Sequence, residues 1–123
     1  MTVVLVRHAE TTFNAARVVQ PPDTPLSERG REQARRLAAR LAGSGIRQIR
    51  SSDLARARAT AQALHAGTGA PLVLDPELRE RDYGTIRGTP YAELDVDIFG
   101  ADYVPPEGEG WDPFHRRVDQ AWC

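Results

Sequence analysis

The sequence contains no lysine, a single cysteine at position 123, and no long apolar run. One cysteine excludes a framework of disulfides within the chain and is typical of a reducing compartment. The only N-terminal apolar run, Val3–Val6, is too short for the core of a signal peptide or for a membrane span. We therefore expect a cytoplasmic protein that does not have a membrane as its partner.

The sequence also lacks an excess of either charge. It has 16 basic residues against 17 acidic ones in 123 residues, which gives a net charge of -1. A balance of this kind favours neither nucleic acid nor an anionic membrane surface as a partner. All the basic residues are arginines, whose planar guanidinium binds phosphate and carboxylate through two hydrogen bonds at once. A bias in composition is the simpler explanation for the missing lysine. The length corresponds to one domain.

Apolar runs and helical periodicity alternate along the chain, in the order strand, helix, strand, helix, strand. Val3–Val6 is β-branched and continuous, as in a strand that is buried on both faces. This order predicts an α/β fold with a largely parallel sheet. The other expected strands are Ile46–Ile49 and Leu72–Leu74. The expected helices are one capped by Ser27 and ended by Gly43–Gly45, one from Asp53 to His65 closed by Gly67, a short one near Tyr91–Leu94, and one from Trp111 onward.

Arg7 and His8 stand directly after the first predicted strand. In open α/β sheets the ligand crevice lies beyond the carboxyl ends of the strands. A neutral imidazole, with an ordinary pKa of about 6.5, is a competent nucleophile at neutral pH. Attack on a phosphoryl group needs cations or aimed donors around its oxygens, and Arg7 and Asn14 could supply them. A histidine taken alone is more often a packed or surface residue.

Two further clusters carry groups suited to phosphoryl transfer. In "SSDLARARATA", Arg56 and Arg58 are two positions apart and point to different sides of a helix, so one can face a site while the other meets solvent. In "LRERDYG", Glu80 lies just past the third predicted strand, and its carboxyl group could give a proton to a leaving oxygen and later take one from water. A solvated basic helix face and an ordinary charged loop are the alternatives.

Arg7-His8-Ala9-Glu10-Thr11 with Asn14 resembles the signature of the histidine phosphatase superfamily, which includes the cofactor-dependent phosphoglycerate mutases. The resemblance continues in the expected order through "LSERGREQA", "SSDLARARATA", "LRERDYGTIRG" and "PPEGEGWDPFHRRV". It implies a three-layer α/β/α sandwich with a mostly parallel sheet, similar to that of the phosphoglycerate mutases.

The resemblance also implies a role for each matching residue. His8 would be the nucleophile that becomes phosphohistidine, and Glu80 would be the proton donor and acceptor. Arg7 and Arg56 would clamp the phosphoryl group, and Asn14 would help to hold it. Arginines then carry the charge that a metal would otherwise supply, and the sequence shows no spacing typical of a metal site. We therefore expect neither a metal nor another cofactor.

The sequence departs from the family pattern at two points. Ala9 stands where the family often has glycine, which is a tolerable change. The family also has a second active-site histidine in a Ser-His-Gly context on a late strand, which neither His65 nor His115 matches. We therefore expect residues 1–123 to be a single but incomplete domain without the last strand and helix. The uncovered edge near Trp122 would be a site of association between copies of the chain.

The leading functional hypothesis is a phosphomonoester hydrolase that acts on a small phosphorylated metabolite through phosphohistidine at His8. Phosphotransfer of the phosphoglycerate mutase type is the alternative within enzymes. The short chain favours the phosphatase, because mutases of this family carry additional segments that enclose the substrate. A third hypothesis is a catalytically weak or inert remnant that binds phosphorylated ligands without turnover.

Overall fold

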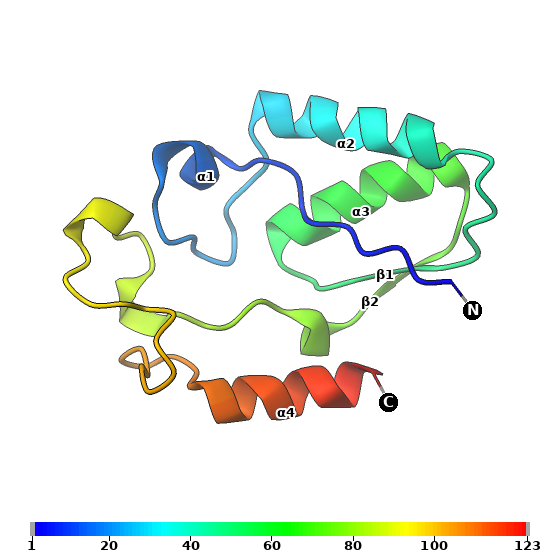
Figure 1. The fold of residues 1–123 in the computed structure, drawn as a ribbon. Helices are drawn as coiled ribbons and strands as arrows, with labels where there is room; N and C mark the ends of the chain where they lie inside the picture. The colour runs from blue at the N-terminus through cyan, green and yellow to red at the C-terminus, as the bar shows by residue number, and fades with distance from the viewer. Residues whose placement is uncertain (1, 123) are drawn as a thin grey trace.

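The computed structural model describes residues 2–122 and shows a small parallel sheet that lies between helices (Figure 1). The helices are α1 (Thr12–Ala16), α2 (Glu28–Leu41), α3 (Ala55–Thr68) and α4 (Trp111–Trp122). The strands are β1 (Ile49–Ser51) and β2 (Leu72–Leu74), and the single 3₁₀ turns are η1 (Pro76–Leu78), η2 (Gly84–Ile86) and η3 (Tyr91–Glu93). The predicted α/β class is confirmed.

Helix α2 begins where the sequence predicts it. The Ser27 hydroxyl accepts a hydrogen bond from the Gly30 amide at 3.0 Å, and Glu28 lies in the first turn, where the helix dipole favours an acid. The buried face of α2 carries Ala34 and Ala38 and packs against α3. The amphipathic pattern of this segment was therefore a sufficient signal for its structure.

Helix α3 runs past the glycine that was expected to close it. Gly67 lies inside the helix, where a Cβ atom would come within 2.7 Å of the Cβ atom of Ala38 in α2. The helix ends instead at Gly69, which has a left-handed φ of 74° that suits glycine. Gly67 therefore permits close packing of the two helices and does not end α3.

The two strands pair in parallel, with Ile49 opposite Leu72 and Ser51 opposite Leu74. Helix α3 connects them and packs on both strands (Figure 1). The strand expected at Leu72–Leu74 is confirmed, whereas the one expected at Ile46–Ile49 begins only at Ile49. The Ile49 amide donates to the Pro71 carbonyl, so the ladder starts at this residue.

The prediction of a first strand buried on both faces at Val3–Val6 is wrong. This segment has no regular structure, and its side chains are 53%, 50%, 81% and 39% exposed in sequence order. A strand exists only through hydrogen bonds to a neighbour. Within residues 2–122 the described ladder joins β1 to β2, and Val73 and Leu74 of β2 are themselves exposed. The apolar run has a high strand propensity, but a strand also needs a neighbouring strand to pair with.

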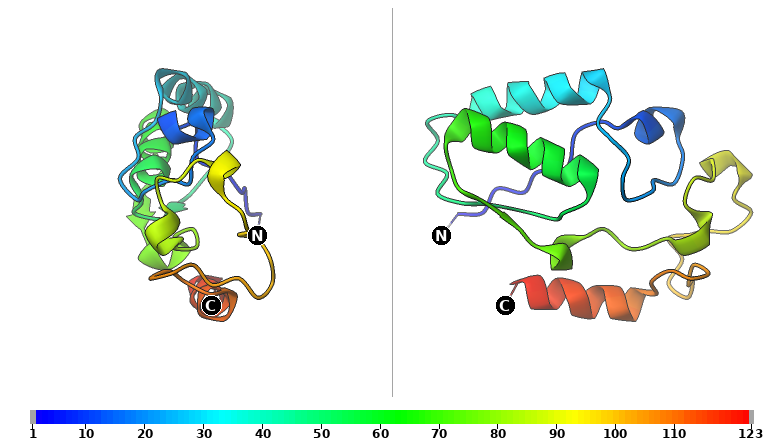
Figure 2. Two further views of the ribbon diagram at one scale, coloured as in Figure 1. Left: turned by 90° about the vertical axis from the view of Figure 1, so that its left-hand side faces the viewer. Right: turned by 180° about the vertical axis from the view of Figure 1, so that it is seen from behind.

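Helix α4 lies on the opposite side of the strand pair from α2 and α3, as the front and side views agree (Figures 1 and 2). It packs on η1, directly after β2. Its start at Trp111 is as predicted, and Trp122 at its other end is exposed. In the described part of the chain, no helix has both the length and the apolar character needed to cross a membrane.

Candidate active site

His8 lies in the segment between Val6 and α1 and is partly buried. Its Nδ1 atom is 2.7 Å from the Ala9 carbonyl oxygen. A carbonyl can only accept, so the ring proton is on Nδ1, and Nε2 of the neutral imidazole keeps its lone pair. Burial is the main cause that lowers the pKa of His8 from its ordinary 6.5, and the positive charges of Arg56 and Arg7 act in the same direction. The Ala9 carbonyl and the Glu80 carboxylate oppose them. The ring is therefore neutral at neutral pH, with Nε2 unprotonated.

The backbone beside His8 is fixed by α3. The Ala9 amide donates to the Thr60 hydroxyl at 3.0 Å, and this hydroxyl donates to the Arg56 carbonyl at 2.8 Å. The chain of bonds links the His8 segment to the helical turn that carries Arg56.

Helix α2 holds the other side of the same segment. The Ser27 amide donates to the Glu10 carbonyl at 2.9 Å, and a Cβ atom on Gly30 would lie 1.9 Å from this same oxygen. Only glycine lets the helix approach so closely. The His8 segment therefore has a defined position even though it lies outside the sheet.

Arg56 and Glu80 form an ion pair at the N-terminal end of α3. The Nη2 atom of Arg56 is 2.9 Å from Oε2 of Glu80, and its Nη1 atom donates to the Pro21 carbonyl at 3.1 Å. The Arg56 side chain is 5% exposed and that of Glu80 is 49% exposed, so a buried cation meets a half-exposed carboxylate. Arg58 is exposed, in agreement with the prediction that the two arginines differ in orientation. The guanidinium of Arg56 therefore has a fixed place, while the carboxylate of Glu80 can be reached from solvent.

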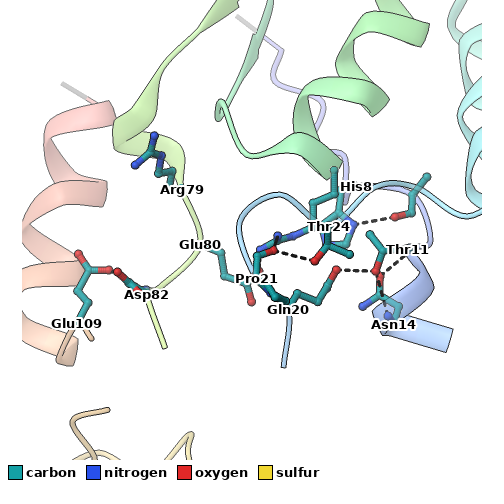
Figure 3. Close-up of polar contacts among 12 residues, drawn as sticks. His8, Thr11, Asn14, Gln20, Pro21, Thr24, Arg79, Glu80, Asp82 and Glu109 are labelled. Carbon is teal, nitrogen blue, oxygen red and sulfur yellow. Dashed lines mark hydrogen bonds and ion pairs between the residues drawn. The ribbon is translucent and has the colours of Figure 1, made fainter. Parts of the chain in front are cut away.

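Asn14 belongs to a network at the start of α1 (Figure 3). Its side-chain oxygen accepts from the Thr11 backbone amide at 3.2 Å, and its backbone amide donates to the Thr11 hydroxyl at 2.9 Å. Thr11 is completely buried and donates in turn to Oε1 of Gln20 at 2.5 Å. The network occupies the side-chain oxygens of Asn14 and Gln20. It therefore leaves their NH₂ groups as the atoms suited to an anion.

Arg7 is placed differently from the other predicted site residues. It is exposed, and it forms no ion pair with any residue in the range 2–122. Its charge still lowers the pKa of His8 and opposes the burial that raises the pKa of Tyr91. The charges of Arg56 and Glu80 act on the same two rings. These charges therefore act on the pKa of His8, and Arg7 is exposed to solvent.

A cavity of about 400 Å³ opens beside Arg56 and Glu80, which both line it. His8, Arg7 and Asn14 are not among the residues that line the cavity. The other lining residues are Val19, Gln20, Pro22, Leu54, Pro76, Glu77, Arg79, Arg81, Asp82, Tyr83, Arg87, Tyr91, Glu109 and Arg117. The volume and mixed charge suit a small polar molecule. Within residues 2–122, no cluster of three His, Cys, Asp or Glu side chains is arranged to hold a metal ion.

Sequence reasoning missed Gln20 and made no prediction for Arg81. Gln20 comes from an irregular loop with no periodic signal, and only the contact with Thr11 brings it to the site. Arg81 stands next to Glu80 but is buried, where it donates to the carbonyls of Ile98 and Tyr103 and lies 4.0 Å above the Trp111 ring. Arg81 is therefore a structural cation that holds the segment before α4.

Comparison with known proteins shows the family of the chain. The histidine phosphatase superfamily (branch 1) matches residues 3–123, and the chain belongs to this family. It is 40% identical over 112 residues to the probable phosphoglycerate mutase GpmB of Cronobacter sakazakii and, over the same length, to that of Yersinia pestis. These matches cover 90% of this chain and 47% of each relative, so the chain spans about half the length of these proteins.

Solved structures of the family show the same fold. Mycobacterial hydrolase 1 has a TM-score of 0.82 at 34% identity, covering 94% of this chain and 60% of its own. A mycobacterial glucosyl-3-phosphoglycerate phosphatase in complex with VO3 has a TM-score of 0.83 at 34% identity, covering 94% of this chain and 59% of its own. TTHB049 from Thermus thermophilus has a TM-score of 0.76 at 36% identity, and the match covers 95% of this chain and 68% of its own. The fold is therefore that of a phosphoglycerate mutase-like histidine phosphatase, represented in part.

Proposed function

We propose that this chain hydrolyses phosphomonoesters of small metabolites through a phosphohistidine at His8. One observation carries the proposal: a buried arginine and a half-exposed carboxylate, Arg56 and Glu80, are paired at 2.9 Å beside an imidazole whose Nε2 is free. A nucleophile, a phosphate-binding cation and a proton carrier are the groups that this reaction needs.

In the first step, Nε2 of His8 attacks phosphorus and the bond from phosphorus to the ester oxygen breaks. Glu80 in its acid form gives its proton to the departing oxygen, which leaves as an alcohol. Negative charge spreads over the remaining phosphoryl oxygens in the transition state. Arg56 stabilises this charge, together with Arg7 and the NH₂ group of Asn14.

The Arg56–Glu80 ion pair explains how binding can prepare this step. A phosphate dianion and the Glu80 carboxylate compete for the same guanidinium. Arrival of phosphate on Arg56 releases Glu80, and repulsion from the dianion favours the protonated acid. The group that was an anion in the resting site thereby becomes the proton donor.

In the second step, Glu80 is a carboxylate and takes a proton from water. The water oxygen attacks phosphorus, the bond from phosphorus to Nε2 breaks, and inorganic phosphate leaves with the neutral imidazole restored. Apart from the ester and the water, each step uses only groups of this chain.

Acid-quench labelling tests the proposal. The chain is mixed with a radiolabelled phosphomonoester and quenched, and the protein-bound label is treated with acid or base. We expect label that acid removes and base does not, lost in His8→Ala and retained in His115→Ala. Label that survives in His8→Ala would refute the phosphohistidine.

Phosphotransfer of the mutase type is the second candidate, because the relatives from Cronobacter sakazakii and Yersinia pestis carry the name probable phosphoglycerate mutase. Supplying a phosphoglycerate and water as competing acceptors separates the two reactions. Efficient isomerisation would reverse the ranking, whereas release of inorganic phosphate supports hydrolysis.

Binding of phosphorylated ligands without turnover is the third candidate, since His65 and His115 both lie outside the family's Ser-His-Gly context. Titration with vanadate followed by a hydrolysis assay identifies it. Saturable binding with neither label on His8 nor release of phosphate would support this function over the enzyme.

A further inference from the structure

Glu80 lies on a segment that has no regular structure of its own. Residues 79–83 follow η1 and belong to neither strand nor helix. Backbone carbonyls in such a segment need partners from elsewhere. A proton carrier on an unsupported loop would have a poorly defined position, so the support of this loop matters for any role of Glu80.

Arg117 supplies that support from α4, on the side of the strand pair opposite α2 and α3 (Figure 1). Its Nη1 atom donates to the carbonyls of Glu77 and Arg79, at 2.9 Å and 2.7 Å. Its Nη2 atom lies 3.4 Å from the carbonyl of Glu80 itself. One guanidinium thus reaches three carbonyls on the approach to Glu80.

Glu109 orients this guanidinium and holds the chain on the other side of Glu80. Its carboxylate accepts from Nε and Nη2 of Arg117, at 3.0 Å and 2.7 Å. The same carboxylate accepts from the Asp82 amide at 3.3 Å, and the Glu109 amide donates to the Asp82 carbonyl at 2.7 Å. Figure 3 shows Glu109 beside Asp82, with Glu80 directed away toward Pro21.

The Glu109–Arg117 pair is largely enclosed, with side-chain exposures of 17% and 19%. Burial opposes ionisation of Glu109, yet the hydrogen bond from Arg117 and that from the Asp82 amide hold its pKa below the usual range. Glu109 therefore stays a carboxylate opposite the guanidinium, and charge-assisted bonds of this kind are among the stronger ones in proteins.

Arg117 has no donor left for a ligand. An arginine has five N–H groups, and the contacts of Arg117 number five: two to Glu109 and one each to the carbonyls of Glu77, Arg79 and Glu80. It lines the cavity, but it cannot bind a substrate anion without giving up these bonds. Arg117 therefore acts on the site by holding the backbone at and before Glu80.

We propose that Arg117, oriented by Glu109, is a positioning residue that fixes the backbone of Glu80 and so holds its carboxylate against Arg56. The inference deepens the proposed function, because it rests on Glu80 as the proton carrier. It makes α4 part of the site: this helix packs on η1 and determines where the acid stands.

The experiment follows the imidazole of His8 by NMR titration in the whole chain. The Glu80 carboxylate raises the pKa of His8, so any displacement of this carboxylate lowers the midpoint of the titration. We expect Arg117→Lys to lower it by most of the change that Glu80→Gln produces. Arg116→Ala, an exposed neighbour on the same helix, serves as the matched control and should leave it unchanged.

A double substitution separates positioning from general destabilisation. In the Glu80→Gln background, Arg117→Lys should no longer move the His8 midpoint, because the carboxylate that it positions is gone. Glu109→Gln weakens the clamp more gently and should give a smaller shift in the same direction, which keeps the test open if Arg117→Lys fails to fold. A folded variant of either residue with an unchanged midpoint overturns the inference.

The titration needs no turnover, so its failure and that of the proposed function are distinguishable. Absence of label on His8 in the original chain contradicts the enzyme, while the midpoints still report on the clamp. If turnover is present, Arg117→Lys should reduce kcat by up to about 10²-fold with little change in KM, as expected for a misplaced proton carrier. An equal loss in Arg116→Ala would show that the effect is not specific.

Discussion

The guanidinium of Arg56 lies 2.9 Å from the carboxylate of Glu80, although Arg56 is in the first turn of α3 and Glu80 follows η1. The arginine is enclosed and the acid is half exposed, so the pair combines a fixed cation with a carboxylate that can move. In the proposed mechanism the pair must open before either group acts. The contact would then be the resting arrangement, which an incoming phosphate rearranges.

Substitution of Arg56 should remove binding of phosphate-like anions. We expect Arg56→Ala to abolish saturable binding of vanadate and to lower any turnover by about 10²–10³-fold, the usual effect of losing one aimed donor. Arg56→Lys keeps the charge but loses the planar fork, and it should recover only part of the affinity. Arg58→Ala, on the exposed side of the same helix, is the control. Equal vanadate affinity in Arg56→Ala and Arg58→Ala would contradict this assignment.

The stability of the chain should depend on pH through His8. Burial first, and then the charge of Arg56, lower the pKa of this ring below its ordinary 6.5. Between the folded pKa and 6.5 the unfolded chain therefore binds more protons than the folded chain, so the free energy of unfolding rises with pH there. This contribution is fully present above about pH 6.5, and it is lost as the pH falls through the folded pKa.

Urea unfolding of the chain at a series of pH values measures this dependence. His8→Gln should flatten the rise that the chain shows below about pH 6.5. His115→Gln removes an exposed imidazole from α4 and serves as the matched control. A rise that persists unchanged in His8→Gln would place its origin elsewhere.

Local signals in the sequence predicted the helices well and the first strand badly. Ser27 caps α2 through a bond three residues along the chain, and such contacts can be recognised without knowing the fold. The Val3–Val6 segment has the composition of a buried strand, but a ladder requires a second strand that composition does not specify. The residues at 3–6 have a high strand propensity, but they form no strand in the structure.

The candidate residues that belong to sequence motifs could be predicted, whereas those placed only by tertiary hydrogen bonds could not. Residues 7, 8, 14, 56 and 80 were predicted as site residues because they stand in ordered patterns along the chain. Arg117 binds mostly to backbone carbonyls of residues nearly 40 positions earlier. Backbone acceptors are the same for every residue type, so no pattern in the sequence marks such a contact. The same reasoning applies to Gln20 and its bond to Thr11.

The exposed apolar segment at residues 3–6 should make the chain associate with copies of itself. Leu5 is the most exposed of these side chains, and Val73 and Leu74 of β2 are exposed as well. Unpaired backbone next to apolar side chains is prone to pairing between chains. We expect concentration-dependent association in sedimentation velocity that Leu5→Glu reduces. Val104→Glu, at an exposed apolar position in the loop before α4, is the control. A monomer at all concentrations would contradict the expectation.

Thr11 offers the sharpest test of the network that holds Asn14. It is fully buried, its hydroxyl accepts from the Asn14 amide, and it donates to Gln20. Thr11→Val keeps the shape of the side chain, but it leaves the Asn14 backbone amide and the Gln20 side-chain oxygen without the hydroxyl. This loss should lower the free energy of unfolding by about 1–3 kcal/mol. Thr11→Ser keeps the hydroxyl and should restore most of the vanadate affinity, because the NH₂ groups of Asn14 and Gln20 regain their orientation. Urea unfolding and vanadate titration measure the two effects separately. If Thr11→Val lowers stability while vanadate binds as tightly as in Thr11→Ser, the network supports only the fold, and Asn14 is not a phosphate ligand.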